Sequence, residues 1–284
     1  MKTPEEFHYR LPRRFAGWRP GSHPGLSLGA GQEFVSHASL HDRPDPRRLD
    51  LRASLRNLRG DWLVRVHRQR VSTPVYAVVD VSASMHFGAP RTKLQVTEDF
   101  IEALGQSAFR AGDTVGMLAF DAQERTDLFM PAVHSRGAAG LMVSALASSS
   151  GTAGSVAGLE QASVKLAGRS SLIFLISDFH WPLAGLARVL DSLAKAYVVP
   201  MVVWDPAETQ PPSGNGLMIL HDAESGAERS FWLRSSLRER WRSAVEQRRA
   251  ELNALFSTRA IRPFYMYGRF EGDALSQYFF EASG

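Results

Sequence analysis

The sequence predicts an α/β protein with a doubly wound, mainly parallel sheet that is covered by helices on both faces. Three observations lead to this prediction. The chain has 284 residues of which 44% are hydrophobic, enough for a sizeable core. Short apolar runs rich in β-branched residues recur along it, and most of the segments between them carry apolar residues at helical spacing. Apolar strands that alternate with helices are typical of a parallel sheet with helices on both sides.

The predicted elements follow one another from Pro74 onward. A buried strand at 75–81 precedes a helix at 92–110, which Gly112 ends. Next come a buried strand at 113–121 and a strand at 126–132, which Pro131 places at an edge. The later elements are helices at 137–147 and 154–167, a strand at 171–178, a helix at 183–195, a strand at 197–205, a hairpin turning near 224–226, a helix from Ser236 with Glu239 in a capping box, a strand within 262–268 and a helix at 272–282.

Residues 1–70 differ in composition from residues 71–284, and we interpret them as a basic N-terminal extension or small subdomain. They hold 14 of the 33 Lys and Arg residues but only 7 of the 29 Asp and Glu residues. The stretch 17–34 is rich in Gly and Pro and is predicted to be loop, and 62–70 is predicted to be a strand. A basic segment of this kind binds nucleic acid, binds an acidic partner, or pairs with the acidic remainder of the chain.

Several function classes are excluded or disfavoured by composition. The chain has no cysteine, which excludes disulfides, cysteine-ligated zinc and thiol catalysis. No apolar stretch has the length of a signal peptide or a membrane span, so we expect a cytoplasmic protein. The phosphate-binding and nucleophile-elbow patterns of nucleotide-binding proteins and hydrolases are missing from the sequence.

Oxygen-bearing side chains stand where the predicted strands end. Asp80, Ser82 and Ser84 follow the strand at 75–81 at a spacing of two, and Asp178 ends the strand at 171–178. Ligands of doubly wound sheets bind beyond the carboxyl ends of the strands, so these side chains should share one edge with Thr152 from an intervening loop. An all-oxygen set favours Mg²⁺, with Mn²⁺ or Ca²⁺ also acceptable. The structural alternative is that these residues cap turns and helix ends.

These motifs resemble those of a known family. "DVSAS" (80–84) with Thr152 and Asp178 resembles the metal-ion-dependent adhesion site of von Willebrand factor A (vWA) domains. Together with "GAGQEF" (29–34), "DPRRLDLRAS" (45–54), "GDTVGMLAF" (112–120) and "ISDF" (176–179), it resembles a bacterial family of vWA proteins whose genes commonly lie beside a MoxR-type AAA+ ATPase. The form without membrane segments looks most like the family member found in the methanol-dehydrogenase maturation cluster.

The resemblance implies a function and a set of ligands. Ser82, Ser84 and Thr152 would contact the ion, and Asp80 and Asp178 would hold it directly or through water. The loop "GTAGSVAGLE" departs from the family pattern, and Ser150 or Ser155 is the alternative to Thr152. The implied function is a binding module that uses the ion to bind an acidic side chain of a client protein, in partnership with the ATPase and without enzymatic activity.

Two other functions compete with this interpretation. A metal-dependent phosphohydrolase would use Asp80 as its nucleophile, but Ser82 stands where a second acid is usual, and Lys93 or Lys165 would have to neutralise the phosphoryl group. A nucleic-acid binder would use the Arg residues of 1–70, such as Arg47, Arg48, Arg52 and Arg56, but the sequence carries no nucleic-acid-reading motif. Pairing of those Arg residues with Asp45, Asp50 and the acidic remainder of the chain is the simpler expectation.

Overall fold

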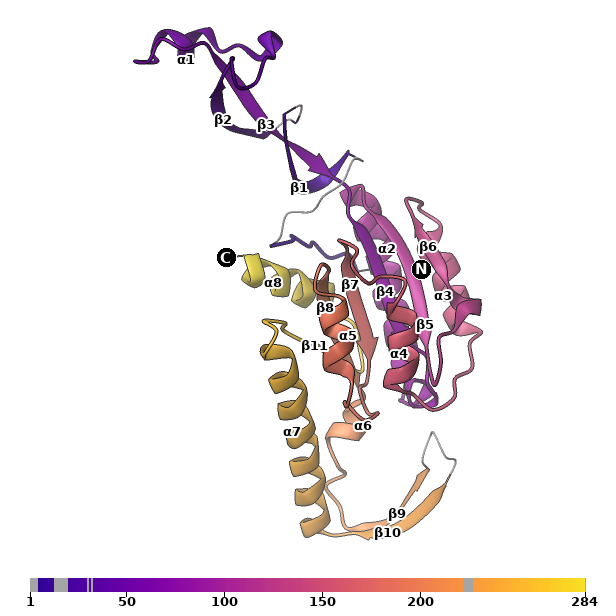
Figure 1. Ribbon diagram of the computed structural model, residues 1–284. Coiled ribbons are helices and arrows are strands. Elements are labelled where there is room, and N and C mark those ends of the chain that lie inside the picture. Colours follow the sequence, from indigo (N-terminus) through magenta and orange to yellow (C-terminus); the bar gives the residue numbers. More distant parts are fainter. Residues whose placement is uncertain (1–4, 13–19, 30, 32, 222–226, 284) are drawn as a thin grey trace.

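A six-stranded sheet forms the centre of the computed structural model, which describes residues 5–12, 20–29, 31, 33–221 and 227–283 (Figure 1). Its strands, in spatial order, are β11 (Phe264–Tyr267), β8 (Tyr197–Trp204), β7 (Leu172–Ser177), β4 (Pro74–Asp80), β5 (Thr114–Phe120) and β6 (Met130–Val133). All neighbouring pairs are parallel except β5 and β6, which are antiparallel. The predicted doubly wound fold is confirmed, and β6 with its Pro131 lies at an edge as expected.

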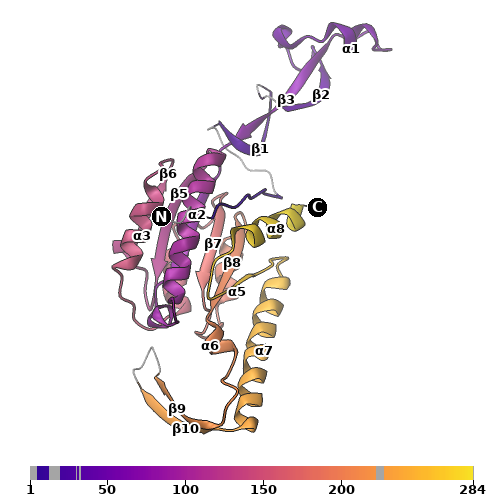
Figure 2. The same cartoon turned by 180° about the vertical axis from the view of Figure 1, so that it is seen from behind.

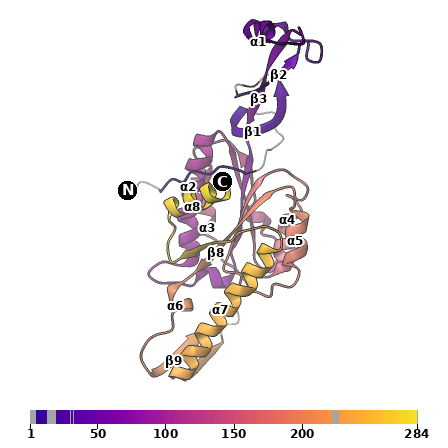
Figure 3. The ribbon, with the colours of Figure 1, turned by 90° about the vertical axis from the view of Figure 1, so that its left-hand side faces the viewer.

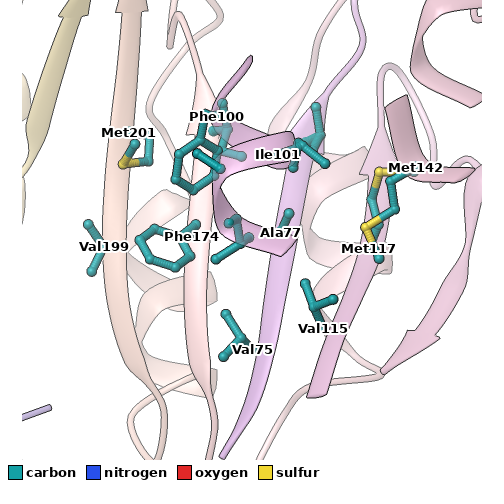
Figure 4. Close-up of a cluster of buried hydrophobic side chains, with 14 of the residues drawn as sticks. Val75, Ala77, Phe100, Ile101, Val115, Met117, Met142, Phe174, Val199 and Met201 are labelled. Atoms are coloured by element: carbon teal, nitrogen blue, oxygen red, sulfur yellow. The ribbon is translucent and has the colours of Figure 1, made fainter. Parts of the chain in front are cut away.

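Helices cover both faces of this sheet because each buried strand is apolar on both sides. In β4, Val75, Ala77 and Val79 join one core cluster, and Tyr76 and Val78 join the other. Figure 4 shows part of the first cluster, where Phe100 and Ile101 lie over the strands. Residues of α2 (Lys93–Ala111), α3 (Ala138–Ala147) and α8 (Gly272–Ser283) line the first cluster, and those of α4 (Val156–Ser163), α5 (Leu186–Ser192) and α7 (Ser235–Ser257) line the second (Figure 3).

Local sequence signals determine where α2 begins and ends. Thr92 caps α2 in a capping box with Gln95, and Gly112 ends the helix in the left-handed conformation with φ 74°. The helix predicted at 92–110 is therefore confirmed within a residue at each end. The capping box predicted at Ser236 and Glu239 is wrong, because α7 begins one residue earlier and its N-cap, Arg234, makes no side-chain capping bond.

The N-terminal part contains a second, antiparallel sheet of strand order β1-β3-β2. Its strands are β1 (Pro20–Gly29), β2 (Glu33–Ser39) and β3 (Leu63–Val71), so the loop predicted at 17–34 is wrong where β1 and β2 lie. Both strands occupy edges, and the β1 register shifts between Pro20 and His23 and again between Pro24 and Leu28. Edge strands with bulges tolerate Pro and Gly, the residues that led to the loop prediction for this segment.

The segment "DPRRLD" folds into two capped turns. Asp45 caps a 3₁₀ turn at 46–48, and Asp50 caps α1 (Leu51–Leu55) by accepting from the Ala53 backbone N–H. Asp50 also accepts hydrogen bonds from Arg65 Nε at 2.8 Å, which holds the pKa of its carboxyl below its usual range. The expected pairing of Arg residues with Asp45 and Asp50 therefore holds for Arg48, which pairs with Asp45. Asp50 pairs with Arg65, a residue outside the expected set.

The two sheets lie end to end (Figures 1 and 2). The N-terminal sheet adjoins the amino ends of the parallel strands, because β3 leads into β4 through two residues, and the carboxyl ends of those strands face the opposite way. Residues 5–11 belong to the α/β body: Phe7 and Leu11 are buried in its first core cluster. The hairpin of β9 (Gly216–His221) and β10 (Glu228–Leu233) lies at the carboxyl end, and its expected turn at 224–226 is outside the described residues.

A one-turn helix, α6 (Pro206–Thr209), follows β8 at the carboxyl edge of the sheet. Within the described part of the chain, every helix is too short or too polar to cross a bilayer.

Asp113 joins the N-terminal segment, the N-terminal sheet and the α/β body. Its carboxylate accepts from Tyr9 Oη at 2.5 Å and from the Thr73 backbone N–H at 2.7 Å, and it lies 2.7 Å from His23 Nε2. We predict that Asp113→Ala lowers the free energy of unfolding by roughly 3 kcal/mol, because buried donors lose a charged acceptor. Urea unfolding measures this loss, and Asp61→Ala, at an exposed carboxylate, should leave stability nearly unchanged.

Hydrogen exchange provides a local check of the same variant. The Thr73 amide should exchange faster in Asp113→Ala, and the Phe7 amide, which bonds Ser107 Oγ at 3.1 Å, should follow if the N-terminal segment detaches. Unchanged protection of both amides would show that Asp113 does not hold these parts together.

Candidate metal centre

The site lies where the strand order reverses, between β4 and β7. These strands are paired in parallel, with Val79 opposite Ile176, so the residues after them emerge at the same edge. Asp80 is the last residue of β4, and Asp178 follows the last residue of β7. This is the switch point at which doubly wound sheets bind ligands.

Asp80 is a fully buried carboxylate with neutral hydrogen-bond donors. Oδ1 accepts from the Ser82 backbone N–H at 2.9 Å, and Oδ2 accepts from Ser177 Oγ at 2.6 Å and from Trp181 Nε1 at 2.9 Å. Burial, followed by the nearby negative charge of Asp178, raises the pKa of Asp80 to about 6. The site therefore holds a carboxylate that a nearby positive charge would stabilise.

The two serines of the motif converge beside Asp80. Ser82 precedes a 3₁₀ turn at 83–86, and its Oγ lies 3.2 Å from Ser84 Oγ. Ser82 is buried and Ser84 is half-buried. A Ser84 hydrogen bond is among the causes that lower the pKa of Asp178, which places Ser84 next to that carboxylate as well.

The loop that carries Thr152 packs against the serines through its backbone. The Thr152 carbonyl accepts from the Ala83 N–H at 2.8 Å, and its own N–H donates to Asp121 Oδ2 at 3.2 Å. A Cβ on Gly154 would lie 3.1 Å from Ser82 Oγ and 2.8 Å from Trp181 Cδ1, so the loop needs glycine there to approach Ser82. The Thr152 side chain itself is exposed.

The alternatives to Thr152 are differently placed. Ser155 caps α4 by accepting from the Gly158 N–H, and its hydroxyl donates to the Ala122 carbonyl at 3.1 Å. Ser150 is exposed, and its carbonyl accepts from Arg125 Nη1 at 2.6 Å. Of the predicted residues, the structure brings Asp80, Ser82, Ser84 and Asp178 together, with Thr152 adjoining them through its main chain.

Asp178 carries an ion pair that the motif does not foretell. Its Oδ2 lies 2.5 Å from Lys93 Nζ, and the same ammonium lies 2.7 Å from Glu208 Oε1. Burial alone would raise the pKa of Asp178, but Lys93 and His180 hold it below its ordinary value. Burial alone would lower the pKa of Lys93, but the two carboxylates raise it above its ordinary value, so the pair is ionised at neutral pH.

Sequence reasoning missed several residues of this neighbourhood. Ser177 and Trp181 bind Asp80, and Glu208 binds Lys93, but nothing in their spacing predicted these contacts. Of the two lysines that a phosphohydrolase would need, Lys93 lies beside the site, and Lys165 pairs with Glu124. One sequence signal could have indicated the pairing of Lys93. A cation at the first position of a helix is repelled by the helix dipole, so a nearby carboxylate is expected to neutralise it.

The four converging residues have the chemistry that a magnesium ion requires. Their donors are carboxylate and hydroxyl oxygens, the neighbouring Ser82 and Ser84 hydroxyls are close together, and Asp80 has neutral partners within the described structure. Asp178, His180 and Glu208 also place ligand atoms within 4.8 Å of one another. The Lys93 ammonium contacts two of these three groups, so a cation already belongs to that second cluster.

The comparisons with known proteins identify the family. Residues 44–251 match the family described as "Protein of unknown function DUF58". The chain belongs to this family. An uncharacterized protein of Mycobacterium tuberculosis is 27% identical over 247 residues, covering 85% of this chain and 76% of the relative, and a Mycobacterium bovis protein matches equally well.

Solved structures resemble the chain at low identity. BatB from Bacteroides thetaiotaomicron aligns with a TM-score of 0.44 and 16% identity over 75% of this chain and 98% of that chain. The SpRpn10 VWA domain aligns with a TM-score of 0.38 and 11% identity over 73% of this chain and 95% of that chain. The fold described above rests on the strand order of this protein itself.

The pKa of Asp80 leads to a prediction about the metal-free protein. Its ordinary pKa is 3.8 and its folded pKa is about 6, so the folded state binds the proton more tightly. Above pH 6, the ionised carboxylate therefore lowers the free energy of unfolding by on the order of 3 kcal/mol. Below pH 4 this loss disappears, because the carboxyl group is then protonated. In EDTA, the stability of wild type relative to Asp80→Asn should fall by that amount between pH 4 and pH 7.

Urea unfolding of both proteins at several pH values measures this difference. Asp61→Asn removes an exposed carboxylate and should show no such pH dependence relative to wild type. A wild-type minus Asp80→Asn difference that stays constant with pH would contradict the raised pKa.

Proposed function

We propose that this protein is a protein-interaction module that uses a divalent cation at the β4–β7 edge to bind an acidic side chain of a partner. The convergence of Asp80, Ser82, Ser84 and Asp178 at the switch point carries this proposal. Asp80, Ser82, Ser84, Thr152 and Asp178 would hold the ion, directly or through water. When bound, Mg²⁺ would supply positive charge and an open coordination position, which a carboxylate from another protein can fill.

The motif resemblance supports a particular partner. Bacterial vWA proteins with these motifs are commonly encoded beside a MoxR-type AAA+ ATPase, so we propose that such an ATPase acts with this chain. In this scheme the ATPase performs work on a client protein, such as a methanol dehydrogenase during its maturation, and this chain makes the contact. An ATP-dependent partner places the chain in the cytoplasm, and we include that location in the proposal.

Binding fits the site better than catalysis. A phosphohydrolase nucleophile must reach the phosphoryl group, but both Asp80 oxygens are buried and accept hydrogen bonds. The Lys93 ammonium is held by Asp178 and Glu208, so it is already neutralised. We therefore propose no enzymatic activity for this site.

A capture experiment tests the proposed function. Immobilised wild-type protein should retain a purified MoxR-type AAA+ ATPase in buffer that contains Mg²⁺, and EDTA should release it. Asp80→Ala should lose at least tenfold in retention because it removes the carboxylate that faces the ion. Asp61→Ala is the matched control and should behave as wild type. Equal retention by wild type in Mg²⁺ and EDTA would contradict a metal-bridged contact.

Gly154 offers a second prediction that needs no partner. A methyl group at this position would push against Trp181 and Ser82 Oγ, and Ser82 would be displaced from the other donors. We expect Gly154→Ala to weaken Mn²⁺ binding about tenfold, measured by the EPR signal of free Mn²⁺. Gly140→Ala introduces the same methyl group in α3, where a Cβ has nothing within 4 Å, and should bind Mn²⁺ as wild type does. Equal affinities for both variants would show that Ser82 is not a ligand.

A further inference from the structure

Lys93 is a buried cation placed where its own helix does not favour it. It is the first residue of α2, its side chain is 2% exposed, and the amino end of a helix repels positive charge. Burial of an ammonium is costly unless it is paired. Its position must therefore depend on the groups that it contacts, which are the carboxylates of Asp178 and Glu208.

The contacts of Lys93 come from three separate parts of the fold. Asp178 follows β7, Glu208 lies in α6, and the Phe87 ring of the turn after β4 has its centroid 5.8 Å from Lys93 Nζ. Glu208 is fixed in turn, because its Oε2 accepts from the Asp205 backbone N–H at 3.1 Å in the capping box of α6. The ammonium is thus held in a built pocket beside the candidate metal centre.

We propose that Lys93 is a tethered cation that neutralises Asp178 and so limits how tightly the site holds a divalent ion. This inference rests on the proposed function and deepens it. With Asp178 paired, Asp80 is the ligand carboxylate without a cationic partner in the described structure. An ion bound there would keep excess positive charge, which favours completion of the site by a carboxylate from outside the chain.

The inference predicts a gain of metal affinity on removal of a charge. Lys93→Met keeps an unbranched side chain of similar length but releases the Asp178 carboxylate, so Mn²⁺ should bind about tenfold tighter or more. A purely structural role for Lys93 predicts the opposite, because disruption of the site weakens binding. Lys195→Met removes an exposed cation from the segment before β8 and should leave Mn²⁺ affinity unchanged. Equal or weaker binding by Lys93→Met overturns the inference.

A double variant determines which carboxylate carries the effect. Glu208→Gln preserves the α6 capping box, since glutamine also serves at that position, and leaves Lys93 paired with Asp178. The double variant Lys93→Met with Glu208→Gln should bind Mn²⁺ about tenfold tighter than Glu208→Gln alone. Loss of that gain in the double variant would assign the effect of Lys93 to Glu208 and overturn the role of Asp178.

Two further outcomes are decisive. If Lys93→Met unfolds in EDTA, Mn²⁺ should restore its circular dichroism spectrum, because the ion replaces the missing positive charge, and failure to restore it contradicts the inference. If wild type shows no saturable Mn²⁺ binding, the proposed function fails. In that case, saturable Mn²⁺ binding by Lys93→Met would still support the role of Lys93.

Discussion

Two carboxylates buried at one edge of the sheet, Asp80 and Asp178, are the constraint around which this part of the molecule is arranged. Neither side chain is exposed to water, and their charges repel each other. The structure meets this cost in two different ways: Asp80 receives three neutral hydrogen bonds, and Asp178 receives an ammonium. This difference leaves Asp80 without a positively charged partner among the described residues. A cation bound next to Asp80 would therefore stabilise its carboxylate.

The alternation of core contacts along β4 explains why Asp80 is held in a buried position. Each face of the strand packs into a different apolar cluster, so its register is fixed, and the residue that follows Val79 has to emerge between the two layers. The same holds for β7, whose six residues are all buried. A rigid core therefore determines where Asp80 and Asp178 lie, and the loops after the strands need only supply hydroxyl groups.

The sequence predicted what depends on local pattern and failed where tertiary contact decides. Apolar runs predicted the strands of the α/β body, and the spacing of Asp80, Ser82 and Ser84 predicted their convergence. Residues 20–29 were predicted to be loop because Pro and Gly disfavour strand, but two bulges and an edge position overcome that preference. Lys93 and Glu208 are 115 residues apart, and no period or motif indicates that α2 and α6 meet over Asp178.

The division of the molecule into two ends bears on how a partner could engage it. The N-terminal sheet of β1, β2 and β3 lies beyond the amino ends of the parallel strands, and the candidate metal centre lies at their carboxyl ends, so the two are at opposite ends of the molecule. Asp113, which contacts Tyr9, His23 and Thr73, links the N-terminal segment and the N-terminal sheet to the α/β body. Under the proposed function, a partner that binds at the candidate metal centre would therefore leave the N-terminal sheet accessible to a second protein.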